Sequence, residues 1–204
     1  MKIDNIRIYG LEESLVASGY PMKDNLQVVE NYMNYQMQDM EPHFKRGKKL
    51  GSVKPGTGHD CYLKGIITQF DLTAPQYFWM QWERYHFQDI ISSQSKMHKL
   101  LNMNIESQCN EYVNYNSITN LERLITNYKK QKELGASKET LDELYQGIVS
   151  NVPMGLELTA RVTTNYLQNK TVYKQRKNHK LKEWHYYCEV LAGMPYFLEL
   201  IGEK

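Results

Sequence analysis

The segment KGIITQFDL, residues 64–72, alternates between apolar and polar side chains, a pattern that predicts a strand at this place in the chain. Ile66, Phe70 and Leu72 fall on one side of an extended backbone. Gln69 and Asp71 fall on the other. A period of two is typical of a strand with one buried face. The sequence therefore predicts a sheet, one face of which other elements must cover.

A helix is predicted to follow this strand without a loop. Thr73 and Gln76 have the spacing of a capping box, and Pro75 suits a first helical turn. We expect this helix to cover residues 75–98. On a helix its polar side chains fall within an arc of roughly 80°; they are Gln81, Arg84, Gln88, Ser92 and Ser95. The opposite side carries Trp79, His86, Ile90 and Met97.

This polar arc has two interpretations. A solvated stripe opposite a buried one is the common arrangement of an amphipathic helix. The arc contains no Lys or Glu, however, and its hydroxyl, amide and guanidinium groups are suited to recognising a ligand. An Arg among aromatic rings, as in WERYHF, can bind a phosphate and stack on a ring system. The pattern alone leaves both interpretations open.

The rest of the chain predicts a mixture of strands and helices. NIRIYG is a short strand pattern, and a second long strand is expected over 156–165. The stretch 45–60 predicts a basic, glycine-rich loop. Helices are expected over 24–40, 118–135, 137–153 (capped by Ser137), 166–177 and 181–201 (broken near Gly193 and Pro195). We therefore predict an α+β fold: a single domain, residues 1–204, with a mixed or antiparallel sheet and long helices.

Bulk composition argues against several classes of protein. A net charge of +2 over 204 residues gives little basis for binding nucleic acid, although FKRGKKLGSVK and YKQRKNHKLK are basic. The three cysteines form no CxxC pair and are expected to be reduced thiols. No segment has the roughly 20 apolar residues that cross a bilayer. MKIDNIRIYG lacks the apolar core of a signal peptide, so we expect a cytoplasmic protein with no membrane association.

The standard nucleotide, metal and hydrolase motifs are missing. The sequence has no GxxxxGK[ST], no GxGxxG after a strand, no HExxH and no GxSxG. No metal site is expected, because His179 and His185 lack a ligand spacing.

Two blocks of the sequence together resemble the flavin-dependent thymidylate synthases. The first contains GHD, KGIITQFDLTAP and QWERYHFQDIISSQS. In the family, a Gly-His-acid loop leads into a strand, an Ala-Pro step, and a helix with Gln-x-x-Arg-His-Arg followed by a Ser and an Arg. The second block contains NVP, LTARVTTN and KQRKNHKLKEW. It is similar to the family's Val/Leu-Pro step, strand ending in Asn, helix with an essential Arg, and Trp-containing helix.

The resemblance implies an enzyme that transfers a one-carbon unit from methylene-tetrahydrofolate to dUMP, giving dTMP, with hydride from reduced FAD and NADPH as the reductant of FAD. It also implies a homotetramer with shared sites. The residues expected to bind FAD are His59, Arg84, Tyr85, His86 and Asn165. Those expected to bind the pyrimidine nucleotide are Gln81, Ser92, Ser93, Gln94, Ser95, Lys96 and Arg176. Arg176 is also expected to be catalytic, stabilising negative charge on a pyrimidine oxygen.

The chain departs from the family pattern at cationic positions. Arg84-Tyr85-His86 stands where the family has Arg-His-Arg, and Lys96 stands near the family's later Arg. A lysine is a point charge, whereas an arginine grips a phosphate with two parallel donors. Three alternatives therefore stay open: a relative acting on another pyrimidine nucleotide, a relative kept as a scaffold, and a nucleic-acid-binding module without catalysis.

Each site residue taken alone also has a simpler explanation. His59 fits an exposed loop, Asn165 fits a helix N-cap after a strand, and Arg176 fits a solvated helix face. Only their occurrence together, in the family's order, favours a site.

Overall fold

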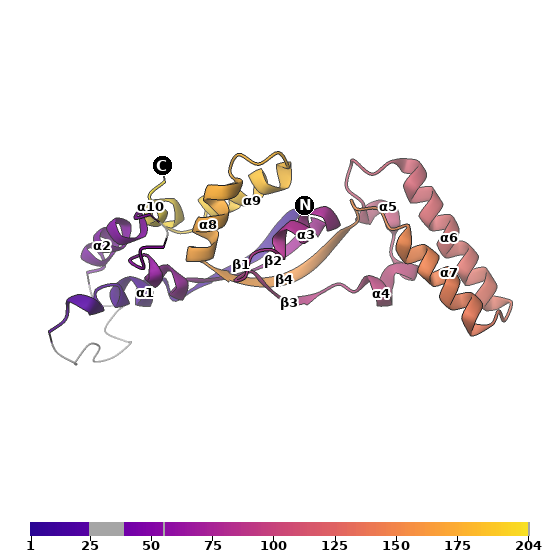
Figure 1. Cartoon of the computed structure of the whole chain (residues 1–204), viewed down its shortest axis with the longest axis horizontal. Coiled ribbons are helices and arrows are strands. Elements are labelled where there is room, and N and C mark those ends of the chain that lie inside the picture. Colours follow the sequence, from indigo (N-terminus) through magenta and orange to yellow (C-terminus); the bar gives the residue numbers. More distant parts are fainter. Residues whose placement is uncertain (25–38, 55, 204) are drawn as a thin grey trace. The chain divides into compact units, whose positions relative to one another are not determined.

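The computed structural model describes residues 1–24, 39–54 and 56–203 (Figure 1). Its sheet has four antiparallel strands in the order β1-β2-β4-β3. The strands are β1 (Lys2–Tyr9), β2 (Ile67–Pro75), β3 (Asp89–Ser93) and β4 (Glu157–Asn165). Among the described helices, none is both long and apolar enough to span a membrane.

The chain divides into two compact units. Unit 1 consists of Met1–Lys2, Leu72–Arg84 and Ile90–Arg161, and unit 2 consists of Ile3–Asp71, Tyr85–Asp89 and Val162–Lys204. Both β2 and β4 contribute residues to each unit. The expectation of a single domain over 1–204 stays a prediction.

Two contacts define how β2 pairs with β4. Tyr166 N donates to the Ile66 carbonyl at 3.0 Å, and the hydroxyl oxygens of Thr73 and Thr159 are 2.7 Å apart. These contacts are consistent with one antiparallel register along the whole length of both strands. Alternate residues of β2 are buried: Thr68, Phe70, Leu72 and Ala74. The predicted strand with one buried face is confirmed.

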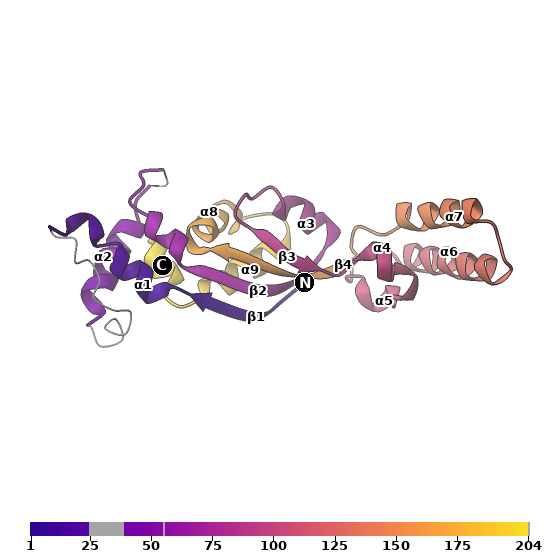
Figure 2. The ribbon, with the colours of Figure 1, turned by 90° about the horizontal axis from the view of Figure 1, so that it is seen from below.

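Unit 1 contains a helical hairpin. α6 (Tyr115–Glu133) and α7 (Lys138–Ser150) lie side by side in both ribbon views (Figures 1 and 2). Gly135 turns the chain between them in a left-handed conformation, with φ of 76°. Ser137 caps α7, its hydroxyl accepting from Thr140 N at 3.3 Å. The helices share a core with η4 (Leu100–Asn102), which follows α4 (Lys96–Lys99), and with α5 (Ile105–Gln108). Its fully buried side chains are Leu100, Leu121, Ile148 and Leu156.

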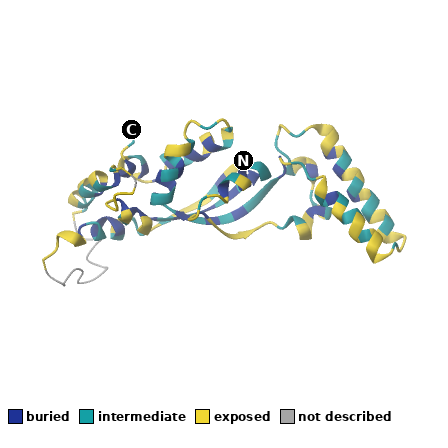
Figure 3. Ribbon diagram, viewed as in Figure 1, coloured by how far each residue is buried: buried dark blue, intermediate teal, exposed yellow. Residues whose placement is uncertain are grey.

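In unit 2, α8 (Tyr166–Arg176) continues β4 and packs against α9 (Lys182–Ala192) and η3 (Cys61–Gly65). α10 (Phe197–Ile201) packs against α2 (Glu41–Gly51) and α9, and α2 packs against α1 (Leu11–Ala17), which η1 (Tyr20–Met22) follows. Figure 3 shows burial along the ribbon. The buried residues of α9 recur at the spacing of one helix face: Trp184, Tyr187, Cys188 and Leu191. The fully buried aromatic side chains here are Phe70, Tyr166, Trp184, Tyr187 and Phe197.

The predicted α+β class and most predicted elements are confirmed, including the break between α9 and α10 near Gly193 and Pro195. The helix predicted over 24–40 falls almost entirely outside the described residues.

The helix predicted over 75–98 is wrong. α3 spans only Gln76–Trp82, and β3 follows at Asp89–Ser93. Ile90 and Ile91 are β-branched residues that favour a strand. At the end of β3, Gln94 N donates to the Thr159 carbonyl at 2.9 Å, while Thr159 N donates to Gln94 Oε1 at 2.9 Å. Pairing with β4 therefore outweighs the helical spacing of the polar residues.

The polar arc inferred from that helix does not exist. Gln88, expected on its solvated side, is 4% exposed, whereas Ile90 and Met97, expected to be buried, are 41% and 59% exposed. The predicted capping box is also wrong, because no side chain caps α3. Thr73 instead contacts Thr159 in the sheet.

The basic loop predicted over 45–60 is wrong in its first half, which forms the end of α2. Its glycines allow close packing instead of turning the chain. A Cβ at Gly47 would lie 2.5 Å from Leu15 Cδ2, and one at Gly51 would lie 2.0 Å from the Leu200 carbonyl oxygen. The close approach of neighbouring elements to α2 therefore requires glycine at both positions.

Gly51→Ala is expected to lower the free energy of unfolding by about 1–3 kcal/mol, because the added methyl group meets a backbone carbonyl that cannot move aside cheaply. Gly147→Ala in α7 is the matched control: nothing lies within 4 Å of its Cβ, so it should raise stability by about 0.5–1 kcal/mol. Urea unfolding of both variants measures the difference. Equal effects of the two substitutions would contradict this account of α2.

Candidate functional site

Arg176 lies at the end of α8 in a cluster with Tyr85 and Trp184. Its Nε donates to the Tyr85 hydroxyl at 2.7 Å. The guanidinium carbon lies 4.7 Å from the Trp184 ring centre and 5.5 Å from that of Tyr85. The Tyr85 hydroxyl in turn donates to Gln175 Oε1 at 3.0 Å. These contacts orient a permanently charged planar group against two aromatic rings.

His179 lies against the same tryptophan. Its ring meets Trp184 edge to face, with centres 6.3 Å apart, and its Nδ1 accepts from Leu181 N at 3.1 Å. Burial lowers the pKa of His179 from 6.5, and the positive charge of Arg176 lowers it further. A neutral imidazole that accepts at Nδ1 carries its proton on Nε2. No sequence pattern predicted these contacts, because they depend on how the chain turns between α8 and α9.

Three of the residues predicted to bind FAD are exposed donors. His59, Arg84 and His86 form no hydrogen bond or ion pair with any other described residue. Their N–H groups are therefore available to an anionic or acceptor-rich ligand. His59 and His86 belong to unit 2, together with Tyr85, whereas Arg84 belongs to unit 1.

Asn165, the fifth predicted FAD ligand, is the N-cap of α8. Its Oδ1 accepts from Gln168 N at 2.9 Å. The simpler explanation of this residue therefore holds, and a contact with FAD stays a prediction.

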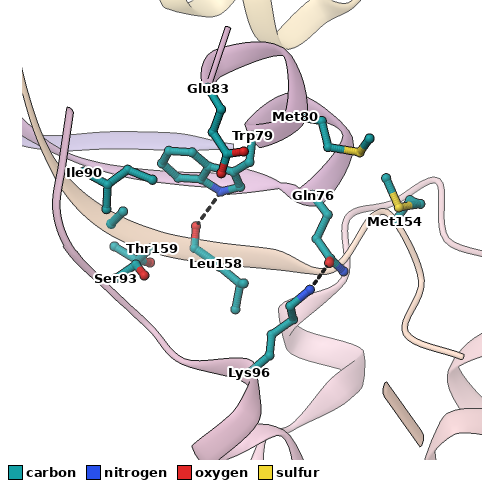
Figure 4. Close-up of a pocket in the computed structure, with 11 residues that line it drawn as sticks. Gln76, Trp79, Met80, Glu83, Ile90, Ser93, Lys96, Met154, Leu158 and Thr159 are labelled. Atoms are coloured by element: carbon teal, nitrogen blue, oxygen red, sulfur yellow. Dashed lines mark hydrogen bonds between the residues drawn. The ribbon is translucent and has the colours of Figure 1, made fainter. Parts of the chain in front are cut away.

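Two predicted nucleotide-binding residues, Ser93 and Lys96, line a pocket of about 290 Å³ in unit 1 (Figure 4). Lys96 Nζ donates to Gln76 Oε1, and Gln76 Nε2 donates to the Pro153 carbonyl at 3.0 Å. Lys96 thus brings an ammonium group to the pocket, held by a neutral amide. A carboxylate is also present, that of Glu83.

Trp79 and its neighbours form the apolar part of the pocket lining. The indole Nε1 donates to the carbonyls of Ala74 and Leu158, at 2.9 and 3.3 Å. The polar edge of Trp79 is therefore used within the chain, and the ring offers carbon surface. Met80, Ile90 and Met154 add apolar surface, so the pocket combines a hydrophobic wall with a few polar groups, as ligand pockets usually do.

Within unit 1, Gln81, Ser92, Gln94 and Ser95 do not line this pocket. Gln94 pairs with β4, and Ser95 caps α4 by accepting from His98 N at 3.3 Å. Ser92 is exposed on β3, and Gln81 is half-buried in the last turn of α3. Sequence reasoning missed Gln76, Trp79 and Glu83, which it had placed on a longer helix.

A chain of buried polar groups, also unforeseen, crosses the core of unit 2. Gln88 Nε2 donates to the Tyr187 hydroxyl at 3.3 Å, and this hydroxyl donates to Asn169 Oδ1 at 2.8 Å. Asn169 Nδ2 donates to Thr68 Oγ1 at 3.3 Å. Burial holds the pKa of Tyr187 well above its usual value, so the phenol stays a neutral donor. This chain fixes the segment that carries Tyr85 and His86.

Neither metal ligands nor disulfides form in the described part of the chain. No group of three His, Cys, Asp or Glu side chains is placed to hold a metal ion. Cys61, Cys109 and Cys188 are free thiols.

Comparison with known proteins identifies the fold. No protein-family model matches the sequence, and no curated protein matches it either. Solved structures do match: the flavin-dependent thymidylate synthase ThyX of Helicobacter pylori, complexed with FAD and dUMP, has a TM-score of 0.65 at 11% identity over 98% of this chain and 97% of that chain. The UMP/dUMP methylase PolB of Streptomyces cacaoi, bound with 5-Br dUMP, has a TM-score of 0.59 at 9% identity over 93% and 87%.

The chain has the fold of the flavin-dependent thymidylate synthases.

The structure shows where two residues that depart from the thymidylate synthase pattern lie. Tyr85, which stands where the family has His, is the hydrogen-bond partner of Arg176. Lys96, which stands near a family Arg, lines the pocket of unit 1. Two of the departures from the family pattern therefore lie in the Arg176 cluster and in the pocket of unit 1.

The cluster predicts a pH effect at His179. Its proton is bound less tightly in the folded chain, so this group opposes folding as pH falls below about 6.5. Arg176→Gln removes the nearby positive charge and should raise the pKa of His179, as followed by NMR titration. His43, whose pKa is lowered by burial and then by Arg46, is the internal control and should not change. An unchanged His179 titration would contradict the arrangement of the cluster.

Proposed function

We propose that this protein is an FAD-dependent methyltransferase that converts dUMP to dTMP, using methylene-tetrahydrofolate as the one-carbon donor and NADPH as the reductant. The observation that carries the proposal is the oriented guanidinium of Arg176, held by Tyr85 and Trp184 on a thymidylate synthase fold. A related reaction on another pyrimidine nucleotide would use the same groups.

The exposed donors fit a flavin dinucleotide. His59, His86 and Arg84 carry N–H groups that no described residue occupies, and a pyrophosphate and a flavin edge are rich in acceptors. The amide of Asn165 and the ring of Tyr85 complete the proposed set. When bound, FAD supplies the hydride that reduces the transferred one-carbon unit to a methyl group.

Arg176 is the proposed catalytic residue. A guanidinium donates hydrogen bonds to the pyrimidine O2 or O4 and stabilises the negative charge that develops there as C5 becomes nucleophilic. Tyr85 and Trp184 fix its orientation beforehand, so that little reorganisation is needed during the reaction. The hydrophobic surface of the Trp184 ring also keeps water from one face of the guanidinium, which strengthens its hydrogen bonds to a ligand.

Lys96 is the proposed phosphate-binding residue of the substrate. Its ammonium contacts only a neutral amide among the described residues, none of which pairs a carboxylate with it. The apolar wall formed by Trp79, Met80 and Met154 suits the non-polar part of a nucleotide.

We further propose that complete sites form in a cytoplasmic homotetramer. β3 is at the end of the strand order, and Ile90 and Ile91 on it are 41% and 52% exposed. An edge strand has unpaired backbone groups that another chain can pair with, and exposed apolar surface marks interaction sites; both support assembly at this edge.

The nucleic-acid-binding alternative is less well supported. Lys48 in the first basic stretch pairs with Glu199, and Lys177 in the second pairs with Glu203 at 2.7 Å. Arg176 is packed against aromatic rings. These contacts reduce the free positive charge of both stretches.

The purified protein is expected to show flavin absorbance, or to acquire it on addition of FAD. With methylene-tetrahydrofolate and NADPH it should convert dUMP to dTMP, detected by mass spectrometry, and dCMP and UMP offered in the same assay define the substrate. Colourless protein that takes up no FAD, and forms no methylated nucleotide, would rule out the proposal.

Arg176→Ala is expected to lower kcat about 10²–10³-fold, because one preorganised charge on the reacting ring is lost. Tyr85→Phe keeps the ring but removes the hydrogen bond to Nε, so it should lower kcat about tenfold with a smaller effect on KM. Steady-state kinetics measure both. Lys49→Met, at an exposed lysine of α2, is the control. A Tyr85→Phe enzyme with unchanged kcat would show that the hydroxyl does not position Arg176.

A further inference from the structure

Lys170, in the middle of α8, is a lysine without solvent contact. Its side chain is 1% exposed. Burying an ammonium group costs free energy unless each of its N–H donors has a hydrogen-bond partner. The sequence pattern gives no reason for a lysine here, since the neighbouring Asn169 and Val172 are also buried.

Three acceptors satisfy this ammonium. Nζ donates to the Gly51 carbonyl at 2.7 Å, to the Val53 carbonyl at 3.0 Å and to Asp60 Oδ2 at 2.6 Å. An ammonium has three N–H donors, so all of them are used. We call this arrangement the Lys170 clamp, meaning Lys170 Nζ with its three acceptors.

The acceptors share a position in the chain: they lie at the two ends of one loop. Gly51 is the last residue of α2, and Val53 follows its C-cap, where backbone carbonyls lack helical partners and favour a cation. Asp60 stands immediately before η3. One side chain of α8 therefore joins the start of the loop to its end.

His59 is the residue next to the clamp. It is exposed, whereas Asp60 beside it is 3% exposed. Gly58 precedes it with φ of 79°, a left-handed conformation that glycine adopts without strain. Among the described residues, the Asp60 carboxylate receives no hydrogen bond except that from Lys170. The clamp therefore holds the residue that follows His59, while the Gly58 carbonyl before it accepts from Cys61 N at 3.3 Å.

We propose that Lys170 is a positioning residue, which fixes residues 56–60 around His59 in the conformation that receives the cofactor. This inference rests on the proposed function, in which His59 contacts FAD. Fixing a loop before binding removes part of the ordering cost that the ligand would otherwise meet. Asp60 acts through the same contact, so the two side chains form one unit.

The test compares the wild-type chain with Lys170→Met and with the double variant Lys170→Met/Asp60→Asn. The single variant leaves a buried carboxylate without its partner and is therefore expected to be the less stable of the two. The double variant removes both charges together and keeps similar volumes, so it provides folded protein if the single variant does not. Lys49→Met, the same chemical change at an exposed lysine of α2, is the matched control.

Two measurements separate positioning from general stabilisation. Amide hydrogen exchange of residues 56–59 reports the loop, with the amides of α6 as an internal reference for global stability. Titration with FAD, followed by flavin absorbance and fluorescence, reports cofactor binding. We expect exchange in the loop to accelerate while α6 is unchanged, and the Kd for FAD to rise about tenfold. Lys49→Met should change neither.

Two other results would contradict the inference, one at the contact with the loop and one at cofactor binding. Unchanged exchange of residues 56–59 in a folded variant shows that the clamp does not hold the loop. Faster exchange with unchanged FAD affinity shows that the loop is held but does not serve the cofactor. If the wild-type chain itself binds no FAD, the proposed function fails first, and the exchange data still decide whether Lys170 fixes the loop.

Discussion

The pairing of β2 with β4 determines where the functional side chains lie. Both strands pass into helices without a loop, so their register sets where α3 and α8 begin. The hydrogen bond from Tyr166 N to the Ile66 carbonyl closes the ladder at the first residue of α8. Arg176 is the last residue of the same eleven-residue helix. A slip of one residue would turn every side chain of a strand to the opposite face, and α8 would carry Arg176 to a different place.

Buried polar groups make this register specific. Thr68 on β2 contacts Asn169 on α8, which contacts Tyr187 on α9. Lys170 on the next position of α8 holds Asp60 and two backbone carbonyls. Such groups are satisfied in one arrangement only, and leaving them buried without partners costs about 1–3 kcal/mol each. Apolar residues would stabilise several nearby packings, whereas these contacts select one of them.

Local sequence patterns predicted the strands with one buried face and the helices whose ends are marked by glycine or a capping residue. The alternation from Ile66 to Leu72 gave β2, and Gly135 with Ser137 separated α6 from α7. The pattern failed between Trp82 and Ser93, because a polar stripe with helical spacing does not reveal that Gln94 and Thr159 exchange hydrogen bonds. That contact joins residues far apart in the sequence, and no local signal carries it.

The candidate site was predictable to the same extent. The order of motifs pointed to Arg176, and Lys96 and Ser93 do line a pocket. The sequence could not show that Gln76 holds Lys96, because Gln76 matched a capping pattern equally well. It could not show the Lys170 clamp either, since a lysine in a helix is usually a solvated residue. Side-chain partners that come from different elements become visible only when the fold is known.

The structure gives Tyr85 an interpretation that differs from the one its sequence position suggests. Read along the chain, Tyr85 in place of His removes a nitrogen base from a cationic motif. In the structure its hydroxyl accepts the Nε proton of Arg176, and its ring faces the guanidinium. A histidine changes charge near neutral pH, whereas a phenol can accept this hydrogen bond without adding a second positive charge beside the arginine. At this position the chain therefore has a phenol that accepts from the guanidinium and faces it.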